Sequence, residues 1–332
     1  MFSQTFAMPA HGEPILSLRF VNKSYGNVRA VRDFSLEIPR GCIYGFLGPN
    51  GAGKTTTIRS IMNIILPDSG EVLFANSPLN ATLRDRIGYL PEERGLYRKM
   101  KCVEQLAYLA QLKSIPRREA LKRAEKWLER LDLADWKQHK MDALSKGMQQ
   151  KVQFAATFIF SPDLVILDEP FTGLDPLNIE LLREIILLER DRGTTTIFST
   201  HMLAEAEKIC DAICLIEGGV KILDGTLDSV RQQFPMHSVH VAYADGSEPP
   251  AKLPQVSQRK FEDGVWRLTM VEGSDPQQLL GQLAKIGALS YFSANRPSLS
   301  EIFLTAVKRS RDEHAGGAGE DSPTISALEG EI

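Results

Sequence analysis

The residues Gly48-Pro49-Asn50-Gly51-Ala52-Gly53-Lys54-Thr55 decide the fold that this sequence predicts. They fit the pattern G-x-x-x-x-G-K-[ST] of a phosphate-binding loop. The apolar run 42–47 before them is typical of a buried strand, and a helical pattern follows over residues 53–64. Glycines let the backbone curl so that successive N–H groups point at phosphate oxygens, and the helix dipole adds positive potential. The stretch therefore predicts a strand, a phosphate-binding turn and a helix.

Lys54 and Thr55 carry the chemistry of this loop. A lysine at this position supplies a point charge for the β- and γ-phosphates, and the threonine hydroxyl is a ligand for Mg²⁺. We therefore expect ATP and Mg²⁺ as the bound groups. The predicted nucleotide-binding residues of the loop are Gly48, Pro49, Asn50, Gly51, Ala52, Gly53, Lys54, Thr55 and Thr56.

A second apolar run, residues 164–167, ends in the two carboxylates Asp168 and Glu169. A buried strand would deliver them at its C-terminal edge, where ligands of parallel sheets collect. We expect Asp168 to hold Mg²⁺, partly through water, and Glu169 to polarise the attacking water. Acidic pairs at strand ends are common, but one downstream of a phosphate-binding loop indicates a nucleotide hydrolase or kinase.

Further motifs narrow this choice. Leu144-Ser145-Lys146-Gly147-Met148-Gln149-Gln150 precedes the acidic pair, Gly173-Leu174-Asp175 follows it, and His201 comes directly after a β-branched run over residues 194–200. This ordered set resembles the ABC ATPase family from Leu16 to about Gly225. A small-molecule kinase would need an acceptor site and has no use for the 144–150 motif.

The resemblance implies a role for each matched residue. Ser145 and Gly147 correspond to the signature loop, which binds the γ-phosphate held by the opposite cassette. Asp175 matches the loop that crosses the dimer interface. His201 matches the switch that contacts the γ-phosphate and, with Glu169, is expected to be catalytic. Tyr25 matches the aromatic residue that stacks on adenine.

Three positions depart from the usual family pattern. Glu92 stands where the family has Gln, and it can still serve as a Mg²⁺ ligand but cannot donate a hydrogen bond when ionised. Lys146 and Met148 replace residues of the signature loop. Together with the segment 297–303 (PSLSEIF), these variants resemble the cassettes of ABC-2-type exporters, including the sodium-efflux and drug-resistance groups.

The order of strand and helix patterns predicts an α/β fold with a mostly parallel sheet as its core. By resemblance, an antiparallel β subdomain and an inserted helical subdomain (about 93–160) complete a P-loop NTPase cassette over residues 14–225. Residues 226–308 read as a small α+β accessory domain, with apolar faces that extend from Val239 to Ile302 and Phe303. Residues 309–332 are acidic and predicted to be disordered.

Composition limits the partners. The 332 residues carry a net charge of −3, which gives no electrostatic footprint for nucleic acid. No apolar run approaches the roughly 20 residues that span a bilayer, and the N-terminus has no secretory pattern. Four scattered cysteines suit a reducing compartment. We therefore predict a peripheral protein on the cytoplasmic face of the plasma (inner) membrane.

The partners follow from the resemblance. One complete set of motifs favours a homodimer of cassettes formed with ATP, which would drive a separate multi-span membrane subunit of ABC-2 type. The alternative is a soluble ABC ATPase acting on ribosomes or nucleic acid, although such translation factors usually carry two cassettes in one chain.

Overall fold

The centre of the molecule is a mostly parallel sheet. The computed structural model describes residues 13–93, 95–234, 238–262, 264–271, 273–295 and 297–315. The six strands of the central sheet lie in the order β10-β9-β3-β8-β7-β6, and only β10 runs antiparallel to its neighbour. Their bounds are β3 (Ile43–Leu47), β6 (Ile87–Leu90), β7 (Leu164–Asp168), β8 (Thr195–Thr200), β9 (Ala212–Glu217) and β10 (Val220–Thr226).

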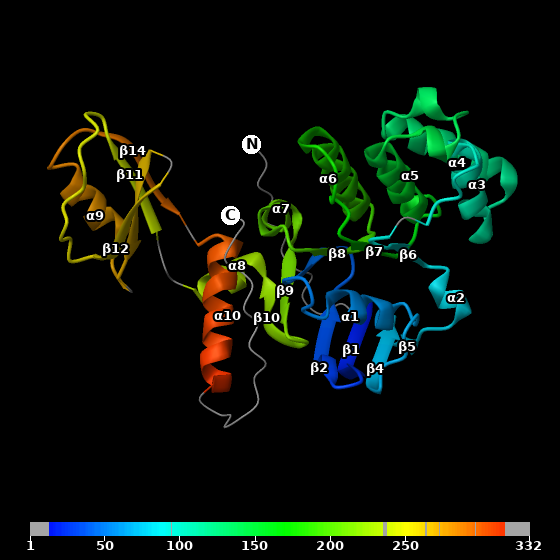
Figure 1. Ribbon diagram of the computed structural model, residues 1–332, viewed down its shortest axis with the longest axis horizontal. Coiled ribbons are helices and arrows are strands. Elements are labelled where there is room, and N and C mark those ends of the chain that lie inside the picture. Colours follow the sequence, from blue (N-terminus) through cyan, green and yellow to red (C-terminus); the bar gives the residue numbers. More distant parts are fainter. Residues whose placement is uncertain are drawn as a thin grey trace.

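Every residue of β3, β7 and β8 is buried, which is why their sequences are continuous apolar or β-branched runs. In Figure 1 this sheet lies between helices on one side and a second sheet on the other. The second sheet is antiparallel, in the order β2-β1-β4-β5. Its strands are β1 (Leu16–Tyr25), β2 (Val28–Ile38), β4 (Ser69–Phe74) and β5 (Ser77–Pro78).

The helices of the cassette fall into two groups. One group flanks the central sheet, and the other forms a helical region beside β6, at the edge of the sheet away from β10 (Figure 1). The flanking helices are α1 (Lys54–Ile61), α2 (Ala81–Arg84), α6 (Pro176–Asp191), α7 (Leu203–Ile209) and α8 (Leu227–Gln232). The helical region holds α3 (Cys102–Leu112), α4 (Arg117–Arg130) and α5 (Lys146–Phe158), with short 3₁₀ turns at Ala134–Trp136 and Met141–Ala143.

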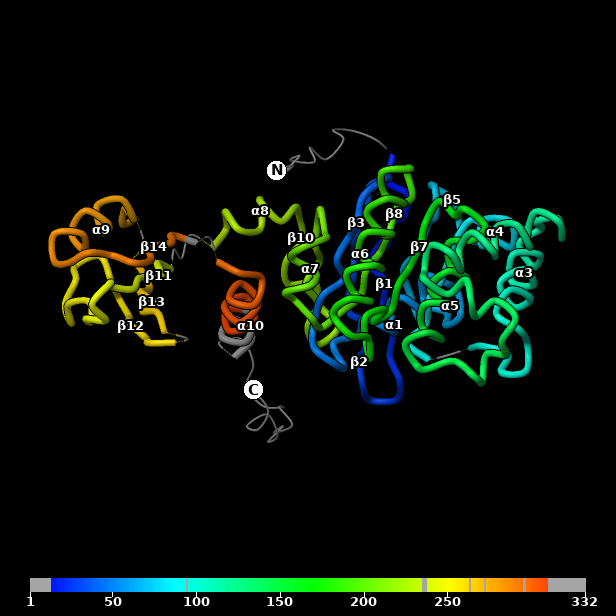
Figure 2. The backbone as a smooth tube through the Cα atoms, turned by 90° about the horizontal axis from the view of Figure 1, so that it is seen from above, coloured from blue at the N-terminus to red at the C-terminus, as the bar shows by residue number. Residues whose placement is uncertain are grey.

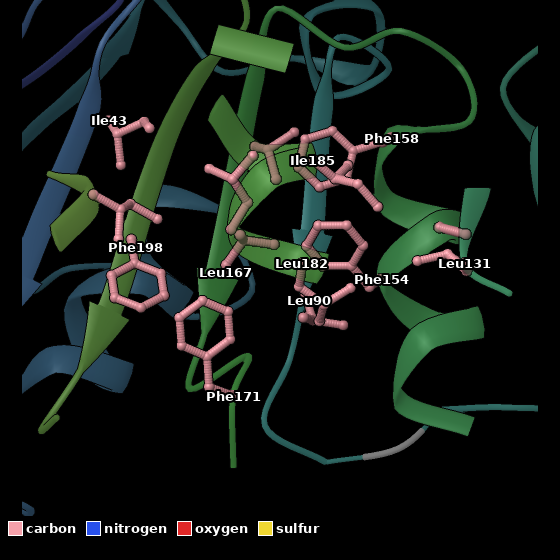
Figure 3. Close-up of a cluster of buried hydrophobic side chains, with 14 of the residues drawn as sticks. Ile43, Leu90, Leu131, Phe154, Phe158, Leu167, Phe171, Leu182, Ile185 and Phe198 are labelled. Atoms are coloured by element: carbon pink, nitrogen blue, oxygen red, sulfur yellow. The ribbon is translucent and has the colours of Figure 1, made fainter. Parts of the chain in front are cut away.

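One buried cluster joins the central sheet to the helical region. Figure 3 shows Leu167 and Phe198 of the sheet together with Phe154 of α5 and Leu182 of α6, all of which are at most 1% exposed. Burying such side chains contributes about 2 kcal/mol each. The core therefore fixes the strand ends that carry Asp168 and the residues after β8. The predicted fold class, a P-loop cassette with an antiparallel sheet and a helical insert, agrees with this architecture.

The C-terminal part contains a separate four-stranded antiparallel sheet in the order β12-β13-β11-β14, with α9 on one face. It lies apart from the central sheet in both views (Figures 1 and 2). Its elements are β11 (Ser238–Tyr243), β12 (Val256–Glu262), β13 (Val265–Met270), α9 (Pro276–Leu283) and β14 (Leu289–Asn295). Among the described residues, no helix is long and apolar enough to cross a membrane.

The last helix, α10 (Leu299–Ala315), corrects one sequence expectation. Its apolar face was expected in the core of the small domain, but Ile302 is buried in the main cluster of the cassette. The spacing of Leu299, Ile302 and Ala306 predicts an apolar helix face without identifying the core that the face joins. The helix packs against α7 and β10 instead.

The helix also continues past residue 309, where the acidic tail was predicted to begin. The sequence has no glycine or proline between residues 308 and 315, so nothing ends the helix before Gly316. Residues 316–332 of the predicted tail lie outside the described residues. The division between the two domains at residue 226 stays a prediction.

Candidate nucleotide-binding site

The phosphate-binding loop has the shape that its glycines allow. Gly51 and Gly53 adopt positive φ angles of 78° and 103°. A Cβ atom on Gly53 would lie 2.4 Å from the Ala30 carbonyl oxygen, and one on Gly48 would lie 2.2 Å from that of Ile216. Only glycine fits at these two positions without moving backbone. The loop leads from β3 directly into α1, so its N–H groups can form an anion cradle at the helix N-terminus.

Lys54 is the first residue of α1 and is 6% exposed. Its Nζ donates to the carbonyl oxygens of Gly48 (2.6 Å) and Pro49 (3.1 Å), and it lies 4.0 Å from Oε1 of Glu169. Burial lowers the pKa of Lys54, whereas the nearby carboxylates, with Glu169 first among them, raise it. The ammonium group is therefore held inside the loop and beside the acidic pair.

Asp168 is 1% exposed at the C-terminal end of β7. Burial raises the pKa of its carboxyl group, and the nearby hydroxyls of Ser199 and Thr55 oppose that shift. The Ser199 hydroxyl donates to Oδ1 at 2.9 Å, while Oδ2 has no hydrogen-bond partner in the part of the chain described. A buried carboxylate oxygen without a partner is costly unless a cation compensates it. Because Thr55 lies beside it, the donor set fits Mg²⁺.

Glu169 joins the ends of β7 and β8. Its side chain is 9% exposed, and its backbone has a φ of 50°, which is unusual for a residue other than glycine. The Oε1 atom accepts from the backbone N–H of His201 at 3.0 Å and lies 2.9 Å from Nδ1 of the same residue. The Thr200 hydroxyl donates to Oε2 at 3.3 Å. Three groups from the end of β8 therefore fix the position of the carboxylate.

These residues share one cavity of about 1080 Å³. Most of the predicted loop residues line it together with Glu92, Asp168, Glu169 and His201. Sequence reasoning missed one wall, which consists of residues 27–30 and 32 in and before β2, with Thr172 and Gly218 at other edges. The wall follows Tyr25 across a tight hairpin, and this proximity is the only signal in the sequence that could have indicated it.

Gly48 and Ala52 of the loop do not line this cavity, and neither do four predicted residues outside the loop: Tyr25, Ser145, Gly147 and Asp175. Tyr25 is 47% exposed at the end of β1, and the Lys23 ammonium lies 5.7 Å from its ring centroid. Its predicted contact with adenine stays a prediction.

The signature residues lie at the exposed start of α5. Ser145 caps this helix by accepting from the N–H of Met148 at 3.2 Å. A Cβ atom on Gly147 would lie 3.5 Å from the Leu174 side chain, so the signature loop lies beside the loop that carries Asp175. Asp175 caps α6 by accepting from the N–H of Asn178 at 2.9 Å, and these bonds lower its pKa.

Lys146 and Met148, the two residues of the signature loop that differ from the usual family pattern, differ in their burial. Lys146 is exposed as the first residue of α5. Met148 is half-buried and packs against the main core cluster. The Met148 side chain therefore contributes to packing.

The fold and the site define a P-loop nucleotide-binding protein. Residues 31–172 match the family model "ABC transporter", and residues 225–307 match the C-terminal domain of DrrA1-3-like ATP-binding proteins. The chain is 37% identical to an uncharacterized ABC transporter ATP-binding protein, YhaQ of Bacillus subtilis, over 88% of this chain and 98% of that protein. The chain belongs to the ABC transporter ATP-binding proteins.

Other similar proteins carry more specific names. The ABC transporter ATP-binding protein NatA of Bacillus subtilis is 38% identical over 61% of this chain and 84% of that protein. The Nod factor export ATP-binding protein I of Cupriavidus metallidurans is 32% identical over 89% of this chain and 98% of that protein. A solved structure of an ATP-binding subunit of an ABC transporter aligns with a TM-score of 0.62 at 32% identity, covering 66% of this chain and 93% of that one. The predicted family and fold class are confirmed.

Proposed function

We propose that this chain hydrolyses ATP and drives export through a separate membrane subunit of ABC-2 type. The observation that carries the hydrolytic part is the position of Glu169, which lies between Lys54 and His201 in the cavity of the phosphate-binding loop. The export part is supported by the match to a DrrA-like C-terminal domain and by the name of the Nod factor export relative.

In this proposal the residues of the site divide into metal ligands, a phosphate-binding residue and the residues that activate water. Thr55, Glu92 and Asp168 would hold Mg²⁺, which supplies charge neutralisation for the phosphates when it is bound. Lys54 binds the phosphate oxygens. Glu169 accepts a proton from the attacking water, and His201 keeps the Glu169 carboxylate oriented through its two contacts at 2.9 and 3.0 Å.

We further propose that two copies of the chain share their sites. Ser145, Gly147 and Asp175 lie outside the cavity of their own chain, on neighbouring exposed helix starts. A helix N-terminus with a hydroxyl group and N–H groups suits a phosphate. A partner cassette could therefore complete each site with its own Ser145 and Gly147, and one set of motifs per chain favours a homodimer.

The shared site predicts dimerisation that depends on ATP. We expect the wild-type chain to be largely monomeric without nucleotide and Glu169→Gln to form a dimer with ATP, because a bound γ-phosphate would bridge the two chains. Light scattering at fixed protein concentration measures this. Ser145→Arg in the Glu169→Gln background should stay monomeric, because its bulk and charge occupy the exposed helix start. A monomer in Glu169→Gln with saturating ATP would contradict the shared site.

We propose that residues 92–101 dock the membrane subunit on the cytoplasmic face of the plasma membrane, where the protein would be peripheral. This segment joins Glu92, at the cavity, to the start of α3. Tyr97 is 52% exposed and contacts Tyr108 edge to face, with ring centroids 5.7 Å apart. The Tyr97 N–H donates to the fully buried Gln105 at 3.1 Å, which anchors the loop below an exposed aromatic pair. Such aromatic anchors are typical of interface centres.

Replacing Tyr97 with Ala, alone and with Leu96→Ala, should abolish transport while ATP hydrolysis by the purified cassette persists. Removing an anchor from an interface centre costs about 2 kcal/mol or more of binding. Transport and copurification with the membrane subunit measure the effect. Phe261→Ala is the control, because Phe261 is an equally exposed aromatic residue in the C-terminal sheet. Unchanged transport would place the docking surface elsewhere.

No observation favours the alternative function, action on ribosomes or nucleic acid.

A further inference from the structure

The helix α10 connects the C-terminal sheet to the cassette. Leu299, Ile302 and Ala306 are at most 3% exposed and belong to the same buried cluster as Ala206 and Ile209 of α7. In Figure 1 this helix stands between the C-terminal sheet and the central sheet. Although it follows the C-terminal sheet in sequence, α10 is therefore part of the cassette core.

An ion pair links the C-terminal sheet to the start of α10. Arg267 on β13 contacts Glu301, and both side chains are about one-third exposed, at 32% and 29%. The other oxygen of Glu301 accepts from the N–H of Ser298 at 2.8 Å and from its hydroxyl at 3.0 Å. This is a capping box, which fixes the first turn of the helix. Glu301 therefore contacts the C-terminal sheet and also stabilises the first turn of α10.

The sheet is not packed closely against α10 at this point. A cavity of about 260 Å³ lies between them, with Gln258, Lys260 and Thr269 on the sheet side and Ile302, Leu304 and Thr305 on the helix side. A cavity provides few van der Waals contacts, so the Arg267–Glu301 pair is a direct side-chain contact between the sheet and α10 at this point.

The other end of this connection reaches the catalytic residues. The helix α7 begins at Leu203, with Met202 between it and His201, and the Leu203 N–H donates to the His201 carbonyl oxygen at 3.1 Å. The Met202 N–H donates at 2.9 Å to the Thr200 hydroxyl, which itself donates to Glu169. A shift of α7 would therefore move the groups that orient the Glu169 carboxylate.

We propose that Arg267 and Glu301 are positioning residues for ATP hydrolysis. The pair joins the C-terminal sheet to the first turn of α10. The apolar face of α10 packs on α7, and α7 in turn keeps His201 and Thr200 on Glu169. This inference rests on the proposed function, because it assigns a role in the hydrolysis that Glu169 performs. It makes the C-terminal sheet a regulator of the catalytic rate, since any partner that separates the sheet from α10 would lower that rate.

Three variants of the full chain test the proposal by ATPase kinetics. Arg267→Gln and Glu301→Gln each remove the ion pair, and glutamine at position 301 retains the capping box. Arg267→Lys retains the charge. We expect kcat to fall by about threefold to tenfold in the two glutamine variants, the range of coupling carried through packed elements. The KM for ATP should change by less than about twofold, because the phosphate-binding loop is not touched.

The double variant Arg267→Gln/Glu301→Gln should lose no more activity than Arg267→Gln alone, because the contact with Glu301 is already absent in that variant. Arg267→Lys should recover most of the rate. Arg259→Gln is the matched control. The Arg259 guanidinium carbon lies 5.1 Å from the ring centroid of Trp266 in the same sheet, and Arg259 does not line the cavity between the sheet and α10. Unchanged kcat in all variants, additive losses, or a loss confined to KM would overturn the inference. The proposed function would stand in each of those cases, whereas a wild-type chain without ATPase activity would overturn both.

Discussion

Replacing Glu169 with Gln is expected to slow ATP hydrolysis by about 10²- to 10⁴-fold, which is the usual contribution of a positioned general base. The amide has the shape of the carboxylate and can still accept from the backbone N–H of His201, so the local structure should persist. It cannot accept a proton from water. Nucleotide affinity should stay within about threefold of wild type, because the phosphate-binding loop is unchanged. Phosphate release and ATP titration measure the two effects separately.

Glu71→Gln is the control for this experiment. Glu71 is an exposed carboxylate on β4, paired with Arg19 at 3.0 Å and outside the nucleotide cavity. Its replacement should leave both hydrolysis and affinity unchanged, because an exposed ion pair contributes little. Near-wild-type turnover in Glu169→Gln would remove Glu169 as the base and would leave its contacts with His201 as a structural feature only.

The parts of the fold that the sequence predicted are those whose signal is local. The strand before the phosphate-binding loop appears as β3, because a strand covered on both faces must be apolar throughout. The glycine pattern of the loop reflects close approaches of backbone to Ala30 and Ile216, which no other residue type tolerates. The acidic pair after β7 follows from the same logic. In each case the burial or backbone geometry of a short segment determines which residue types that segment can contain.

The parts that it did not predict depend on distant segments. The strand β12 lies on an edge of the C-terminal sheet, and five of its seven residues are exposed, so its sequence has no apolar pattern that would indicate a strand. Its pairing with β13 is decided by the neighbouring strand. Likewise, the apolar face of α10 could be recognised, but only the three-dimensional structure shows that Ile302 joins the cassette core.

The candidate site shows the same division. Lys54, Asp168 and Glu169 were predicted, whereas the hydroxyls that hold the two carboxylates, Ser199 and Thr200, were not. Serine and threonine are common in buried strands, so their types carry no signal. Their function arises from the parallel register that places Ser199 beside Asp168. A short motif does not specify the register between two strands that are far apart in the sequence.

The charges around Lys54 determine how much this residue should contribute to ATP binding. Burial lowers the pKa of its ammonium group, while the carboxylates of Glu169, Asp168 and Glu92 raise it. The ammonium group lies 4.0 Å from Oε1 of Glu169. Without it, these carboxylates would face the phosphates of ATP across one cavity, and like charges within a buried site repel strongly. Glu169 would still be held by His201, so the fold around the site should not change.

Replacing Lys54 with Ala should therefore weaken ATP binding by about 2 to 5 kcal/mol, the usual cost of truncating one partner of a buried, hydrogen-bonded charge pair. Calorimetric titration with ATP measures the affinity, and the melting temperature without nucleotide shows whether the fold is retained. Lys221→Ala is the control, since Lys221 pairs with Asp224 at 2.9 Å on β10 and lies outside the cavity. It should bind ATP as the wild type does. An unchanged affinity in Lys54→Ala would mean that the backbone N–H groups of the loop bind the phosphates without help from the ammonium group, and the assigned role of Lys54 would be wrong.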